Sequence, residues 1–198
     1  MSSTQSLKTP SPEENGVVGQ KNQQYLRTPL LSGNDVEAKR QEIADYFNAT
    51  WHRYDGLFET LSDDRAYFQK AIPLRHPLIF YFGHTATFFV NKLVLAGLID
   101  HRVNSQFESM FAIGVDEMSW DDLDEAHYAW PTVQEVRSYR SQVNALINHL
   151  IKTTPLSLPI TWESPWWTIM MGIEHEHIHL ETSSVLIRQQ NIDWVQPH

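Results

Sequence analysis

Residues 171–181 read Met-Gly-Ile-Glu-His-Glu-His-Ile-His-Leu-Glu, and this stretch decides both the predicted fold and the predicted site. It places His175 and His179 four residues apart. At 100° per residue, a helix sends two such side chains out in directions that differ by only about 40°. Two imidazoles on one helix face can bind the same metal ion. His177 points about 160° to 200° away from this pair, so we expect it to take no part in the site.

Apolar side chains recur with helical spacing over long segments of the chain. The predicted long helices cover residues 36–61, 77–99, 131–152 and 165–190. Shorter helices are expected near 64–70 and 104–112, and no segment alternates convincingly as a strand does. Asp35 and Ser164 suit the position that caps a helix start, and Pro165 suits the first turn.

Four long helices with long connections predict an all-α four-helix bundle with long crossover loops. We assign the bundle to residues 31–198. Residues 1–30 are rich in Ser, Thr, Pro, Gln and Asn and contain no signal-peptide core, so they are expected to form a disordered polar leader. The apolar segment 80–99 is long enough to cross a bilayer, but it carries His84 and Lys92. Such groups are costly in lipid, which favours a buried core helix.

The overall composition excludes several classes of partner. The 198 residues carry a formal net charge of −9 and no basic run, which argues against binding to nucleic acid or to an anionic membrane. The chain has no cysteine, so disulfides and thiolate ligands are excluded and histidine and carboxylate remain as metal ligands. This composition fits a reducing compartment, and we predict a cytoplasmic protein.

His84 is the candidate third ligand, because it lies in the middle of the most apolar predicted helix. A lone buried histidine is more often a core residue bonded to a neighbour. The inward-facing pair His175 and His179 on another helix favours a ligand role instead. Gly83 permits a close approach beside it. Glu181 points away from the pair, so we expect it to support the site or form a salt bridge rather than bind the metal.

A competing motif overlaps the same stretch. Residues 175–179 match H-E-x-x-H, the zinc-protease signature, in which Glu176 would be the general base. The extended motif needs a third ligand further along the helix, and neither Thr182 nor Val185 supplies one. We therefore disfavour a protease.

Three blocks of the chain resemble a known family. They are Tyr81–Phe89 (YFGHTATFF), Phe107–Leu123 (FESMFAIGVDEMSWDDL) and Trp162–Arg188, which contains WESPWW and HEHIHLETSSVLIR. These blocks resemble the N-terminal DinB-like domain of 5-histidylcysteine sulfoxide synthase, an enzyme of ovothiol biosynthesis related to the sulfoxide synthases of the ergothioneine pathway. The similarity covers roughly residues 25–198.

The resemblance implies a non-haem iron(II) ion held by His84, His175 and His179. Glu181 matches the final glutamate of the family's H-x3-H-x-E motif, whereas His177 occupies a variable position and inherits no role. The implied reaction joins the sulfur of cysteine to an imidazole carbon of histidine, with O2 as oxidant, and leaves a sulfoxide. The implied substrates are thus histidine, cysteine and O2.

In the family, the cysteine-binding groups and a catalytic tyrosine come from a formylglycine-generating-enzyme-like domain, which a methyltransferase domain follows in ovothiol enzymes. This sequence stops at His198. We therefore expect a fragment with little activity alone, and we assign no catalytic residue to it. The acidic, aromatic segment 115–130 is expected to face the missing domain.

Two other functions stay open. A DinB-like thiol-dependent transferase or hydrolase would use the same bundle and histidines with zinc or nickel. A non-catalytic bundle would bind metal or a partner without turnover. The block Trp162–Arg188 favours the sulfoxide synthase, and the identity of the metal separates the two enzyme classes.

Overall fold

The computed structural model describes residues 27–113 and 129–197 of the chain. Most of the predicted leader and most of segment 115–130 lie outside these ranges. The long helices of the protein are α1 (Val36–Glu59), α3 (Leu78–Leu95), α5 (Val133–Thr153) and α6 (Pro165–Ile187). The short ones are α2 (Arg65–Phe68), α4 (Ser105–Met110) and the 3-10 turn η3 (Ile192–Trp194). The described residues contain no strand, only an isolated bridge between Leu61 and Val195, so the predicted all-α bundle is confirmed.

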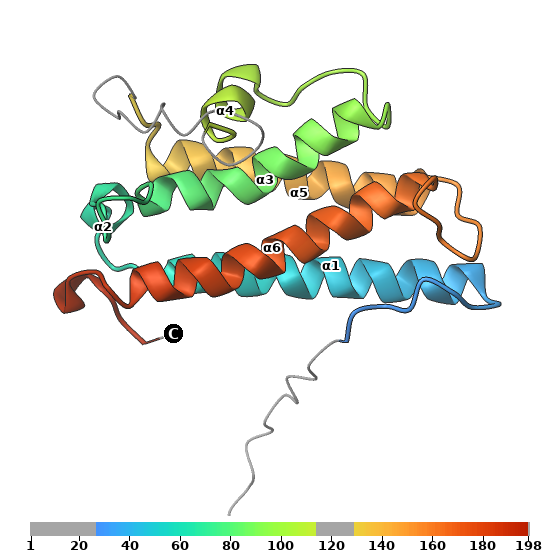
Figure 1. Ribbon diagram of the computed structural model, residues 1–198, viewed down its shortest axis with the longest axis horizontal. Coiled ribbons are helices and arrows are strands. Elements are labelled where there is room, and N and C mark those ends of the chain that lie inside the picture. Colours follow the sequence, from blue (N-terminus) through green and yellow to red (C-terminus); the bar gives the residue numbers. More distant parts are fainter. Residues whose placement is uncertain (1–26, 114–128, 198) are drawn as a thin grey trace, which may run out of the picture.

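The long helices lie side by side as a bundle (Figure 1). α1 and α6 run in one direction, and α3 and α5 run in the other. α3 packs against α5 and α6, and α1 packs against the same two helices. Because α3 and α5 are parallel, a crossover connection joins them in place of a short turn. This crossover carries α4, whose neighbour in the bundle is α3.

Capping residues fix where the helices begin. The Asp35 carboxylate accepts a hydrogen bond from the Ala38 backbone at 2.9 Å, and the Ser164 hydroxyl accepts one from the Trp166 backbone at 3.3 Å. Both caps were predicted. The predicted end of the second long helix at residue 99 is wrong, because α3 ends at Leu95. Gly97 adopts a φ of +68° there, a left-handed conformation that ends the helix.

α3 is the most deeply buried helix, as its apolar sequence predicts. Every residue from Leu78 to Val90 is buried. By length and composition alone α3 could cross a membrane, but the bundle encloses most of it. This burial is the behaviour of a core helix.

Residues just before α1 pack on the bundle. Pro29 is buried, and the Thr28 hydroxyl lies 3.1 Å from the Tyr46 hydroxyl. The Leu31 carbonyl accepts a hydrogen bond from the Ile160 backbone at 2.7 Å. Packing against the helices therefore begins before the predicted boundary at residue 30.

Two apolar clusters fill the bundle from end to end. One includes Ile43, Phe47, Phe89, Val143 and Ile173. The other includes Phe58, Phe80, Phe82, Val136 and Ile187.

Along α3, the residues between the two clusters include His84 and Thr85, and both are fully buried. Arg140 on α5 and Glu176 on α6 are buried at the same level, where they bond to Thr85. The bundle thus has a polar layer near its middle, and the candidate site lies in this layer.

Candidate metal centre

Three histidines from two neighbouring helices converge in the polar layer. His84 comes from α3, and His175 and His179 come from successive turns of α6. One ring nitrogen of each lies within 4.8 Å of the others. The ring centroids are 5.0 Å apart for His84 and His175, 4.7 Å for His84 and His179, and 4.5 Å for His175 and His179. The structure therefore brings together the three residues that the sequence selected.

His84 is held in one orientation by its surroundings. Its Nδ1 lies 2.7 Å from the Phe111 carbonyl oxygen, which can only accept, so Nδ1 donates this hydrogen bond and a metal would bind through Nε2. The Phe80 ring stacks on the imidazole with centroids 5.2 Å apart. A Cβ on Gly83 would lie 2.5 Å from the Phe111 ring, so only glycine lets Phe111 approach this closely. The close approach predicted beside His84 is thus present.

The two histidines of α6 have buried nitrogens that lack a partner. The Nδ1 atoms of His175 and His179 make no hydrogen bond within residues 27–113 and 129–197. The Phe88 ring stacks on His175 with a centroid separation of 3.6 Å. Burying a polar atom without a partner is unfavourable, and a metal ion bound in the cluster would give one nitrogen of each ring a partner. The residues present therefore fit a metal.

Burial also keeps these two rings uncharged. Burial, followed by the nearby His84, His179 and Lys92, lowers the pKa of His175 to about 2. Burial and the neighbouring His84 lower the pKa of His179 to about 3. Both rings are therefore neutral at physiological pH, the form in which imidazole binds a metal. Three neutral nitrogen donors suit iron, zinc, nickel or copper.

The cluster is closed on the α3 side and reaches the surface along α6. His84 is fully buried, whereas His175 and His179 are partly exposed. A groove of about 230 Å³ lies beside His179, and its lining includes Arg75 and Glu181. Glu181 is exposed, lies two residues beyond His179 and is not part of the histidine cluster.

His177 faces a different part of the bundle, as the helical spacing predicts. Its Nε2 lies 2.9 Å from the Thr50 hydroxyl on α1, and its ring stacks on Tyr46 with centroids 5.4 Å apart. These contacts join α6 to α1. His177 therefore has a packing role away from the cluster.

Glu176 does not have the surroundings of a protease base. It is fully buried, and Arg140 Nη2 donates to its Oε1 at 3.0 Å. Burial raises the pKa of Glu176 to about 7, and Arg140 opposes this rise. Its Oε2 makes no hydrogen bond in the described part of the chain. A general base must reach the reacting atoms, so this pairing inside the core argues against the zinc-protease interpretation.

Sequence reasoning missed Arg140. The residue lies in the apolar stripe of α5, four residues after Val136 and three before Val143. A charged residue at such a position signals a buried ion pair, because an unpaired charge is strongly disfavoured there. The sequence therefore contained a signal for Arg140, but none for its partner.

Comparison with known proteins gives two matches. The family description "DinB superfamily" matches residues 46–183, a range that contains all three histidines. Ergothioneine biosynthesis protein 1 of Neurospora crassa is 26% identical over 159 residues. The aligned region is 78% of this chain but only 18% of that protein. The chain thus spans less than a fifth of the length of this relative.

Proposed function

The chain belongs to the DinB superfamily, and on this premise we propose that it is the iron(II)-binding domain of a sulfoxide synthase. The ligands would be His84, His175 and His179. The observation that carries the proposal is the convergence of three imidazoles from two helices. Two of these rings have a buried nitrogen with no hydrogen-bond partner in the described ranges 27–113 and 129–197. The similarity to an ergothioneine biosynthesis protein supports the class of reaction.

The proposed reaction joins the sulfur of cysteine to an imidazole carbon of histidine. The thiol loses its hydrogen, the imidazole carbon loses its hydrogen, and a carbon–sulfur bond forms. One atom of O2 ends on the sulfur as the sulfoxide, and the other leaves as water. O2 accepts four electrons, two from forming the carbon–sulfur bond and two from oxidising the sulfur, so no other reductant is needed. Iron(II) would supply the O2 chemistry that protein side chains lack.

The protein would contribute a rigid and uncharged set of ligands. Phe111 and Phe80 hold the His84 ring, and Phe88 holds the His175 ring. Because imidazole is uncharged when it binds a metal, the full charge of the ion would remain to attract an anionic thiolate. The same aromatic rings exclude water from the α3 side of the cluster.

The groove beside His179 supports amino acids as substrates. Arg75 and Glu181 line it and carry opposite charges, as the carboxylate and ammonium groups of an amino acid require. The N. crassa relative is much longer than the aligned region. We therefore propose that a further domain supplies the remaining substrate contacts.

The test begins with anaerobic loading of the chain with iron(II), followed by cysteine. We expect a thiolate-to-iron absorption band in the near ultraviolet, absent from His175→Ala and retained in His177→Ala. O2 and either histidine or trimethylated histidine are then added, and mass spectrometry detects the sulfoxide. Tight zinc binding that excludes iron would instead indicate a thiol-dependent transferase or hydrolase. Iron binding without a response to cysteine would indicate a non-catalytic bundle.

A further inference from the structure

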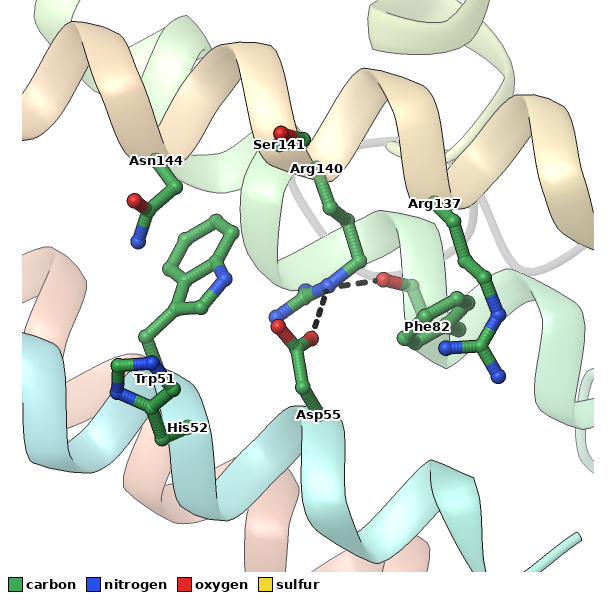
Figure 2. Close-up of a pocket in the computed structure, with 8 residues that line it drawn as sticks. All are labelled: Trp51, His52, Asp55, Phe82, Arg137, Arg140, Ser141 and Asn144. Atoms are coloured by element: carbon green, nitrogen blue, oxygen red, sulfur yellow. Dashed lines mark hydrogen bonds and ion pairs between the residues drawn. The ribbon is translucent and has the colours of Figure 1, made fainter.

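A buried charged network joins all four long helices behind the histidine cluster. Arg140 on α5 is its centre, with only 2% of its side chain exposed. Its guanidinium donates to the Asp55 carboxylate of α1 at 2.8 Å and to the Phe82 carbonyl of α3 at 3.1 Å (Figure 2). It also donates to the Thr85 hydroxyl of α3 at 2.7 Å and to the Glu176 carboxylate of α6 at 3.0 Å. One side chain thus binds every other long helix.

The network meets the candidate metal ligands through their sequence neighbours. Thr85 directly follows His84 on α3, and Glu176 directly follows His175 on α6. The Thr85 hydroxyl donates to Glu176 Oε1 at 3.4 Å, so Arg140, Thr85 and Glu176 form a closed triangle. If α6 slid along α3, the triangle would break, and His175 and His179 would move away from His84.

Aromatic rings hold the guanidinium of Arg140 in place. Its central carbon lies 4.2 Å from the Trp51 ring centroid, 4.9 Å from that of Tyr54 and 5.0 Å from that of Phe82. Figure 2 shows the guanidinium between Trp51 and Phe82 in a pocket between α1 and α5. Such contacts are favourable for a cation and leave it little freedom to shift. The centre of the network is therefore fixed.

Stability alone is a weak reason for this arrangement. Replacing a buried ion pair with apolar residues of similar volume is often neutral or stabilising. The best-attested use of such a pair is to specify register. A core held by apolar packing alone can stay stable after its side chains have lost a single ordered arrangement. A metal site is more demanding, because its ligand distances must lie within about 0.2 Å of their usual values.

We propose that Arg140 and Glu176 are positioning residues that set the register of α3 against α6, so that His84 meets His175 and His179 at metal-binding distance. The proposal rests on the proposed metal-binding function. Groups that orient metal ligands typically contribute about 10-fold to 100-fold in metal affinity. We expect the network to contribute in this range without touching the metal.

The test uses Co(II) as the probe, because its visible absorption reports ligand geometry as well as binding. Arg140→Met with Glu176→Leu replaces the pair with apolar side chains of similar volume, and Asp55 remains partly hydrated with 32% of its side chain exposed. The matched control is Asn48→Ala with Asn148→Ala. These two asparagines also join α1 to α5, by hydrogen bonds of 3.1 Å between their side chains.

We expect the Arg140/Glu176 double variant to fold, to bind Co(II) about 10-fold to 100-fold more weakly and to show shifted visible bands. The asparagine control should match the wild type in Co(II) affinity and in the positions of the visible bands. A folded double variant with wild-type affinity and bands would overturn this inference alone. A wild-type chain that binds neither Co(II) nor iron(II) would defeat the proposed function itself.

A second variant decides the matter if the double variant does not fold. Thr85→Val removes one hydroxyl from the triangle and keeps its shape. It should shift the Co(II) bands and weaken binding by a smaller factor. Bands and affinity equal to those of the wild type would then overturn the inference.

Discussion

Two polar clusters lie one residue apart on α6 and differ in how their polar atoms are satisfied. His175 enters the cluster with His84 and His179, whereas Glu176 enters the network around Arg140. Adjacent helical residues leave the axis 100° apart, so one turn of α6 serves both. Arg140 donates to at least one partner on each of the other long helices. The histidine cluster instead keeps two buried nitrogens without a hydrogen-bond partner among the described residues.

This difference separates a structural role from a binding role. Buried polar groups are normally hydrogen-bonded, and a group that is not needs an explanation. Within the network, each donor lies beside an acceptor, and Glu176 Oε2 is the one buried side-chain atom without a hydrogen bond among the described residues. Within the histidine cluster, the Nδ1 atoms of His175 and His179 find no hydrogen-bond partner in that part of the chain. This difference supports both proposals, that the first cluster sets the register of the helices and that the second binds a metal.

The largest predicted effect comes from removing the cation of the buried charged network. Arg140→Met alone leaves Glu176 buried without its cation, which should lower the free energy of unfolding by about 3–5 kcal/mol. Adding Glu176→Leu should recover most of this loss, because no charge is then stranded. Urea denaturation of the metal-free proteins measures both. Equal stability of the single and double variants would show that the pair is not coupled.

The second prediction concerns the stability gained when a metal ion binds to the histidine cluster. Co(II) at about 100 times its dissociation constant should raise the free energy of unfolding by about 2.7 kcal/mol, because it binds only the folded chain. His179→Ala should remove this stabilisation, whereas excess EDTA should leave the metal-free chain unchanged. Urea denaturation with and without Co(II) provides the measurement. A similar Co(II) effect in His179→Ala would place the ion elsewhere.

The third prediction concerns the contact that keeps α3 and α6 close. A Cβ on Gly172 would lie 2.2 Å from the Phe89 ring, so Gly172→Ala should destabilise the fold by about 1–3 kcal/mol. Adding Phe89→Leu makes room for the methyl group. The double variant should therefore lose less free energy of unfolding than the two single variants lose together. Additive effects in urea denaturation would indicate that the ring moves aside freely.

The last prediction concerns how the stability of the metal-free chain depends on pH. The folded pKa values of about 2 for His175 and about 3 for His179 lie below the ordinary value of 6.5. As the pH falls below 6.5, the unfolded chain takes up protons that the folded chain refuses, so stability is lost between about pH 6.5 and pH 3. His175→Phe should reduce this slope in urea denaturation with EDTA. An unchanged slope would mean that His175 is not the group responsible.

The helices and the histidine cluster could be predicted because both depend on local spacing. The four-residue separation of His175 and His179 fixes their common face, and the apolar surroundings of His84 place it in the core. The three residues lie together because α3 and α6 are neighbours, which a four-helix bundle allows but does not require. The apolar surroundings of His84 and the paired histidines favoured this arrangement, and the family resemblance implied the same three residues.

The supporting contacts could not be predicted, because they depend on how the helices pack. Arg140 and Glu176 lie on different helices, and no pattern along either helix names the other. The bond from His84 depends on the backbone carbonyl of Phe111 in the crossover, and a backbone atom leaves no mark in the sequence. Glu176 was considered only as a protease base, since a short motif draws attention to the residue and says nothing of its partner.

The most direct test of the central claim is an anaerobic titration with iron(II) of the wild-type chain, His84→Ala and His177→Ala. We expect one tightly bound ion per chain in the wild type and in His177→Ala, and loss of tight binding in His84→Ala. Equal iron binding by all three proteins would contradict the assignment of the metal to the histidine cluster.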